Sequence, residues 1–76
     1  MARIRHPRRV ARAKAAIEAR PDIVGFRTTG GHGPYGYRYD LWARRSDGVS
    51  FHVETFYHWH DLLAAVPAPL RTQVNS

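Results

Sequence analysis

The feature that most constrains the fold is the turn Ser46-Asp47-Gly48, which joins two segments of alternating polar and apolar residues. These segments run from Tyr37 to Arg45 and from Val49 to Phe56. A three-residue connection that ends in glycine favours a type I turn closed by a bulge, because glycine adopts positive φ without a steric penalty. The turn sets Arg45 opposite Val49 and so predicts the register of an antiparallel hairpin.

The predicted register gives the hairpin two different faces. Counting away from the turn, one face is apolar and is assigned to the core: Ala43 meets Phe51, Leu41 meets Val53, and Tyr39 approaches Thr55. The other face pairs Arg44 with Ser50, Trp42 with His52, and Asp40 with Glu54. This second face is polar except for Trp42, and we expect it to meet solvent.

Helices are predicted on both sides of the strands. Arg8 to Arg20 consists largely of good helix formers and is stopped by Pro21. The apolar stripe of this first helix comprises Val10, Ala13, Ala16 and Ile17. A second helix is expected from about Phe56 to Val66, with Thr55 as its cap and Pro67 after its end. Its apolar stripe comprises Trp59, Leu62, Leu63 and Val66.

A further strand is predicted from Ile23 to Thr29, which is rich in β-branched and aromatic residues. The resulting α-β-β-β-α order predicts a small α+β domain, with both helices on one face of a three-stranded antiparallel sheet. We expect one domain over residues 1–76, with a flexible basic leader at 1–6 and a frayed tail at 70–76. A chain this short buries only about 60% of its unfolded surface, so homodimerisation is an open alternative.

The net charge of +6 arises entirely within the first twenty residues, where seven cations face Glu18 alone; elsewhere five cations balance five acids. A basic block on a neutral body is typical of a protein with a polyanionic partner, because Arg and Lys neutralise phosphates and release counterions. We expect the partner of the basic block to be nucleic acid in the first place and an acidic protein surface in the second. The third interpretation is a solvated arm that keeps the protein soluble and binds no partner. The residues assigned to nucleic acid are Arg3, Arg5, Arg8, Arg9, Arg12 and Lys14.

The open sheet face offers a second candidate surface, on which Trp42 stands among cations that Arg27 could join. Exposed aromatic and Arg side chains are typical of single-stranded nucleic-acid platforms and equally of protein interfaces. The candidate interface residues are His32, Tyr35, Arg38, Trp42, Arg44 and His52.

His32 and Tyr35 belong to the segment Gly30–Gly36, which holds four glycines in seven residues. The segment matches neither a Walker A loop nor a dinucleotide fingerprint, since no Lys-Ser/Thr follows and the next element is a strand. We interpret it as a flexible hairpin connection, with a phosphate-binding loop as the alternative.

Metal and catalytic sites are weaker alternatives. The chain has no Cys, and His58 and His60 would splay by roughly 200° on a helix, so no metal site and no cofactor is expected. An acid–base pair could combine His32 or His52 with Asp40 or Glu54, as in a metal-independent ribonuclease. The protein is nonetheless expected not to be an enzyme.

The element order resembles that of the double-stranded RNA-binding domain and of the mRNA-cleaving toxins built on the same fold. In those toxins the active His follows a glycine-containing loop, which Gly31-His32 loosely matches. The RNA-binding family has a Lys-rich start to its second helix, whereas this chain has Phe56 to Asp61 there and carries its basic residues in the first helix. The resemblance is one of topology and assigns no function.

The sequence therefore predicts a small, basic, non-enzymatic nucleic-acid-binding protein. The alternative is a compact inhibitor or adaptor of phage or mobile-element type, which docks on an acidic or nucleic-acid-handling protein. No apolar stretch approaches the ~20 residues that span a bilayer, so no membrane partner is expected. The absence of Cys fits a reducing compartment, and the expected location is the cytoplasm.

Overall fold

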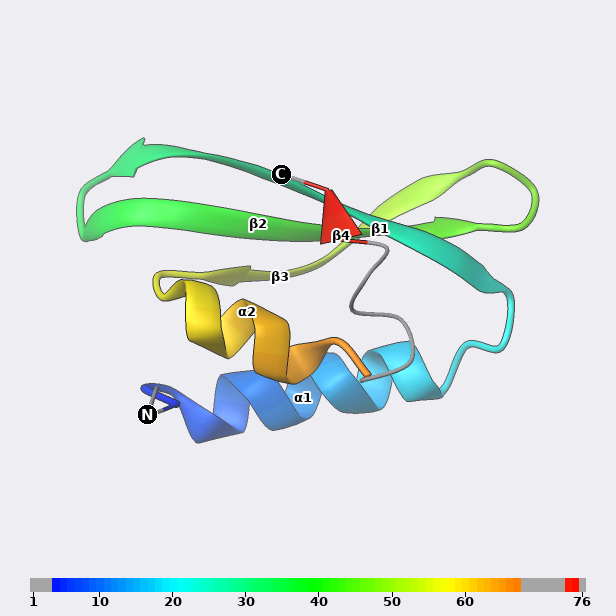
Figure 1. The fold of residues 1–76 in the computed structure, drawn as a ribbon, viewed down its shortest axis with the longest axis horizontal. Helices are drawn as coiled ribbons and strands as arrows, with labels where there is room; N and C mark the ends of the chain where they lie inside the picture. The colour runs from blue at the N-terminus through cyan, green and yellow to red at the C-terminus, as the bar shows by residue number, and fades with distance from the viewer. Residues whose placement is uncertain (1–3, 68–73, 76) are drawn as a thin grey trace.

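The structure, a computed structural model, describes residues 4–67 and 74–75 (Figure 1). Its elements in chain order are α1 (Pro7–Glu18), β1 (Ile23–Gly33), β2 (Gly36–Arg45), β3 (Ser50–Phe56), α2 (Trp59–Ala65) and β4 (Val74–Asn75). The predicted α-β-β-β-α order is confirmed, and β4 is an addition to it.

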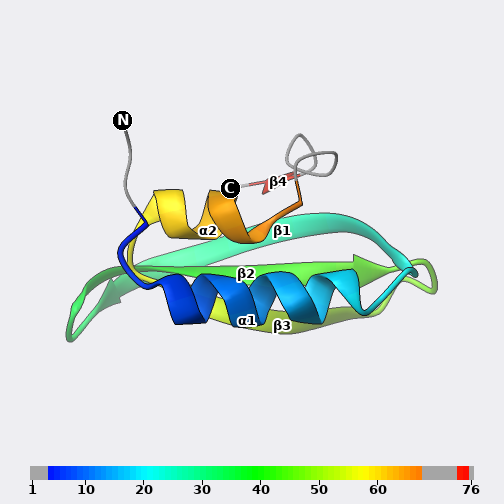
Figure 2. The same cartoon turned by 90° about the horizontal axis from the view of Figure 1, so that it is seen from below.

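The strands form one open sheet in the order β3-β2-β1-β4. β1, β2 and β3 are antiparallel neighbours, whereas β4 runs parallel to β1 and pairs with Phe26 and Arg27. Both helices lie on the same side of the sheet and pack against each other, with α1 beneath β3 (Figures 1 and 2). The predicted α+β layout is thus confirmed, although the sheet has a fourth strand. Of the tail expected to fray from residue 70, the structure describes only Val74 and Asn75, and it places them in the sheet.

The core lies between the sheet and the two helices. The buried apolar residues are Val10, Ala13 and Ile17 of α1, Ile23, Phe26, Leu41, Ala43 and Phe56 of the sheet, and Leu62, Ala65 and Val66 in and after α2. Ala16, which the sequence assigns to the α1 stripe, is exposed. It lies about 100° around the helix from Ile17 and therefore turns away from the sheet.

The hairpin register follows the prediction near the turn and departs from it farther along. The pairs Ala43–Phe51, Arg44–Ser50 and Trp42–His52 are confirmed. Beyond them β3 contains an irregularity at Val53, so that Leu41 faces Glu54, Asp40 faces Thr55, and Tyr39 faces Phe56. The predicted pairs Leu41–Val53, Tyr39–Thr55 and Asp40–Glu54 are wrong, because a one-residue bulge turns every later side chain of β3 to the other face.

The bulge also explains the later start of α2. β3 continues through Phe56, whose side chain is fully buried, so the helix begins at Trp59 with His58 as its N-cap. Thr55 is a strand residue and not the predicted cap. α1 begins at Pro7 and ends at Glu18, two residues before the predicted end.

The glycine-rich segment is mostly strand and not a loop. Gly30–Gly33 extends β1 and pairs with β2 as far as Gly36, so that only Pro34 and Tyr35 form the turn. The backbone of Gly30–Gly33 is thereby engaged with β2, which argues against a phosphate-binding loop.

Candidate nucleic-acid interface

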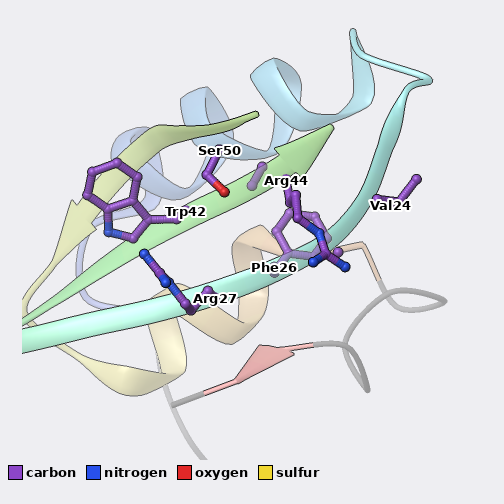
Figure 3. Close-up of a pocket in the computed structure, with 8 residues that line it drawn as sticks. Val24, Phe26, Arg27, Trp42, Arg44 and Ser50 are labelled. Carbon is purple, nitrogen blue, oxygen red and sulfur yellow. The ribbon is translucent and has the colours of Figure 1, made fainter. Parts of the chain in front are cut away.

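A groove of about 450 Å³ opens on the sheet face turned away from the helices, which we call the open face (Figure 3). Its lining residues are Val24, Gly25, Phe26, Arg27, Trp42, Ala43, Arg44 and Ser50. Arg27 of β1 pairs with Trp42 of β2, and the two side chains extend toward one another (Figure 3). The register of β1 shifts between Ile23 and Gly25, at the end of the groove nearest Arg44. The groove therefore combines an aromatic ring with two guanidinium groups; we call it the Trp42 groove.

The Trp42 ring is held in position by its neighbours. Its Nε1–H donates to Thr29 Oγ1 across 2.9 Å. Its ring meets that of His52 edge to face, with 5.3 Å between the ring centroids. The indole is therefore oriented before any ligand arrives.

Asp40 anchors the hydrogen-bond network behind Trp42. One carboxylate oxygen accepts from Thr29 Oγ1 at 3.3 Å and from Arg38 Nε at 3.1 Å, while the other accepts from Thr55 Oγ1 at 2.7 Å. The single proton of the Thr55 hydroxyl is used in this contact, so in the 3.0 Å contact between His52 Nε2 and Thr55 Oγ1 the imidazole is the donor. Two hydrogen-bonded chains thus run from the aromatic rings to one carboxylate.

The network also controls the charge of Asp40. Burial, the largest single influence, would raise its pKa, but the hydrogen bonds from Thr55 and Arg38, the charge of Arg38 and the Thr29 hydroxyl together lower it. The carboxylate is therefore ionised at neutral pH and is a strong acceptor for all three donors.

Two Arg side chains of α1, those of Arg9 and Arg12, contact groups of the same chain. Arg9 donates from Nη1 to the Thr55 carbonyl oxygen at 3.2 Å and lies 5.5 Å from the centroid of the Tyr57 ring. Arg12 forms an ion pair with Glu54 at 3.3 Å. Two of the cations assigned to nucleic acid thus hold α1 against β3, an arrangement that depends on Glu54 being turned toward the helices.

Arg5 and His6, which directly precede α1, are hydrogen-bonded to α2. The backbone N–H groups of Arg5 and His6 donate to the two carboxylate oxygens of Asp61, at 2.8 and 3.0 Å. Asp61 is fully buried in the first turn of α2. Within the leader that the sequence predicts to be flexible, the backbone of Arg5 and His6 is thus held against α2. Arg3 lies outside the described residues.

Most of the described acidic side chains form an ion pair or accept a backbone hydrogen bond, whereas several of the described cations form no ion pair within this part of the chain. The exposed Glu18 is the one described acid for which neither contact is seen. The other acids pair as follows: Asp22 and Asp47 with Arg45, Asp40 with Arg38, Glu54 with Arg12, and Asp61 with the backbone of Arg5 and His6. Two of the cations without an ion pair contact other groups of the fold: Arg9 contacts Thr55 and Tyr57, and the Arg20 guanidinium lies 4.6 Å from the centroid of the Phe51 ring. The other cations that make no ion pair within residues 4–67 fall into two groups. Arg5, Arg8 and Lys14, which we call the helix-side cations, lie on the helix layer, whereas Arg27 and Arg44 lie in the Trp42 groove.

The candidate interface residues divide between two places. Trp42 and Arg44 line the groove, and Arg38 and His52 belong to the network beside it. His32 and Tyr35 are not part of this surface. His32 pairs with Tyr37, and the rings meet edge to face at 5.4 Å. Tyr35 is 82% exposed at the hairpin turn and meets the Tyr57 ring at 6.2 Å.

The acid–base pairs that the sequence suggests are only partly assembled. His52 reaches Asp40 through the Thr55 hydroxyl. His32 lies four residues after the buried Thr28 in β1, so the alternation of side chains along a strand places both on the helix side of the sheet. His32 and Asp40 therefore lie on opposite faces. Glu54 faces Arg12. Among the described residues, no three His, Cys, Asp or Glu side chains gather in a way that would hold a metal ion.

Sequence reasoning named Asp40 only as a possible acid–base partner of a His and missed its hydrogen bonds with Thr29 and Thr55. Alternation from Arg27 would have placed Thr29 on the open face, beside Asp40 and Trp42. No local signal marked Thr55, because the Val53 bulge decides its direction.

Within the described chain, no helix has the length and apolar character needed to cross a bilayer. The chain matches no family model, no curated protein and no solved structure. The likeness to the double-stranded RNA-binding domain therefore stays one of element order, and the candidate surfaces of this chain are the Trp42 groove and the helix-side cations.

Proposed function

We propose that this protein binds nucleic acid without catalysing a reaction. The observation that supports the proposal is the distribution of unpaired charge: Arg5, Arg8, Lys14, Arg27 and Arg44 make no ion pair within residues 4–67, while all but one of the described acids are engaged. A cation without an acidic partner can neutralise a phosphate and release its counterion. Such surfaces favour a polyanion over a neutral ligand.

The helix-side cations suit contact with the phosphate backbone. The exposed face of α1 presents Arg8 and Lys14 among alanines and lacks the Asn and Gln side chains that commonly read base edges. Binding through this surface should depend on charge and shape and little on sequence.

The test is a titration of the purified protein, freed of bound nucleic acid, against labelled single- and double-stranded DNA and RNA at two or more salt concentrations. Affinity should fall steeply with salt. The double variant Arg8→Gln/Lys14→Gln should reduce the slope of log K against log salt by about 0.7 to 0.9 for each phosphate that the protein no longer neutralises.

A matched control removes an equal number of charged groups without changing the net charge. The double variant Arg12→Gln/Glu54→Gln deletes an internal ion pair, so its salt slope should equal that of the parent protein. Failure to bind any of the four nucleic acids, even at low salt, would overturn the proposal.

A protein partner is the second candidate function. Tyr35 in the β1–β2 turn and Tyr37 at the start of β2 are 82% and 45% exposed, and they lie outside both the Trp42 groove and the helix-side cations. Tyrosine is enriched among the residues that dominate protein interfaces. In that case the protein should form a stoichiometric complex with an acidic protein, which Tyr35→Ala weakens. Sedimentation of the protein alone tests whether the partner is a second copy.

A further inference from the structure

We infer that the Trp42 groove binds a single strand of nucleic acid, with one base stacked on the Trp42 indole and the flanking phosphates on Arg27 and Arg44. The inference rests on the proposed function and specifies its ligand. It assigns to the open face a binding mode different from that of the helix-side cations.

Trp42 is preorganised for stacking. A free side chain loses rotational freedom when it binds, and that loss weakens the complex. Here the indole N–H is already bonded to Thr29, and the His52 ring supports the indole edge to face. The Asp40 network in turn fixes Thr29 and His52, through Thr55 in the latter case. The ring is therefore presented at little further entropic cost.

One groove cation lies beside the indole and the other lies toward the opposite end of the groove (Figure 3). Arg27 lies directly across from Trp42 on the neighbouring strand, and Arg44 follows Trp42 by two residues on the same face of β2. Both line the groove, and neither makes an ion pair within residues 4–67. A nucleotide whose base rests on Trp42 would have cations beside its backbone, the combination that single-strand platforms use.

The shape of the groove favours single strands over duplexes. In a duplex the faces of the bases are stacked on one another, and presenting one face to a protein requires unfavourable unstacking or flipping of a base. The groove lies on a sheet surface and offers the face and edge of one ring, without a helix that could enter a DNA groove. It should therefore prefer strands whose bases are already free.

The experiment uses the intrinsic fluorescence of Trp42. The chain has two tryptophans, so Trp59→Phe leaves Trp42 as the single tryptophan, and excitation at the red edge of its absorption avoids the four tyrosines. This variant is titrated with oligothymidylate, oligouridylate and a DNA duplex of equal length. We expect quenching by the single strands and at least tenfold weaker binding of the duplex. Comparison of the two single strands shows whether the groove distinguishes DNA from RNA.

Substitutions then separate stacking from charge. In the otherwise unaltered protein, Trp42→Ala should weaken single-strand binding by about tenfold to a hundredfold, since a stacked base contributes on that scale. Trp42→Phe keeps a ring and should retain most of the affinity. Thr29→Val removes the acceptor of the indole N–H and should cause a smaller loss. If Trp42→Ala does not fold, judged by circular dichroism, the Phe and Val variants and the quenching still decide the outcome.

The outcomes distinguish this inference from the proposed function. Equal affinity for single strand and duplex, no quenching, and unchanged binding by folded Trp42→Ala would overturn the stacking mode, while nucleic-acid binding through the helix-side cations would stand. Absence of binding to every probe would overturn both. Salt-dependent binding of single strands that Arg27→Gln and Arg44→Gln each weaken, together with quenching, would support both.

Discussion

The hydroxyl of Thr55 donates to Asp40 Oδ1 across 2.7 Å, although fifteen residues separate them in the chain. The contact exists because the irregularity at Val53 turns Thr55, and not Glu54, to the open face. Without the bulge two carboxylates would be cross-strand neighbours and would repel each other. With it, Asp40 gains a donor, and Glu54 pairs with Arg12 on α1. The single bulged residue in β3 thus determines that Thr55 lies on the open face and that Glu54 faces the helices.

Thr55→Val should raise the pKa of Asp40 toward its ordinary value and lower the free energy of unfolding by about 1 kcal/mol. The Thr55 hydroxyl is the strongest of the influences that lower this pKa, and it is also the partner of His52. The destabilisation corresponds to one hydrogen bond to a partly buried group. NMR titration of the Asp40 carboxyl and urea unfolding measure the two effects. Thr55→Ser, which keeps a donor, is the control, and an unchanged Asp40 pKa in Thr55→Val would contradict the assignment.

The protein should lose stability in acid through Asp40. Its pKa is lower in the folded than in the unfolded state, so the stabilisation is fully present above the unfolded pKa, ~4, and disappears as pH falls through the folded pKa. Asp47 contributes in the same direction, because Arg45 and the Val49 N–H lower its pKa. Urea unfolding between about pH 7 and 2 should show a steeper acid decline for the parent protein than for Asp40→Asn. Identical pH profiles would rule out this contribution of Asp40.

The parts of the fold that depend on local signals could be predicted from the sequence. Gly48 has a φ of 90° and its N–H bonds the Arg45 carbonyl oxygen, as the predicted turn requires. The turn determines the pairing near it, including Trp42 with His52. Alternation then places Trp42, Arg38 and Arg44 on one face. Helical spacing likewise identifies Val10, Ala13 and Ile17 as the buried stripe of α1.

Features that depend on distant contacts could not be predicted. Nothing local distinguishes Val53 as a bulged residue, so local patterns misplace the partners of Asp40 and the start of α2. The use of Arg9 and Arg12 within the fold follows from the directions of Tyr57 and Glu54, which the bulge also sets. Composition reveals how many cations a helix carries, but only the tertiary structure shows which of them are already paired.

Asp61→Asn should destabilise the protein by about 2 kcal/mol and release Arg5 and His6 from α2. The buried carboxylate accepts one backbone N–H on each oxygen, from Arg5 and His6. An amide keeps the shape but turns an N–H₂ group toward one of these donors, so a part-buried hydrogen bond is lost and its donor faces another donor. Thermal unfolding measures the destabilisation, and amide hydrogen exchange at Arg5 and His6 measures the release.

The matched control for Asp61→Asn is Glu18→Gln. It also neutralises one helical carboxylate, but Glu18 is exposed and makes no ion pair with another described residue. Its effect should stay within about 0.5 kcal/mol. Equal effects of the two substitutions would show that overall charge, and not the Asp61 contact, sets the stability.

Two neighbouring glycines in β1 should respond in opposite directions to alanine. A Cβ at Gly30 would lie 2.5 Å from the Arg38 carbonyl oxygen and 3.1 Å from the Tyr37 ring, so the backbone must shift; at Gly31 the same atom would meet nothing within 4 Å. Gly30→Ala should therefore cost about 1 to 3 kcal/mol, as overpacking does. Gly31→Ala should stabilise by about 0.4 to 1 kcal/mol, since it restricts the unfolded chain without native strain. Urea unfolding of the two variants measures the difference, and equal stability would show that a Cβ at Gly30 fits beside the Arg38 carbonyl oxygen.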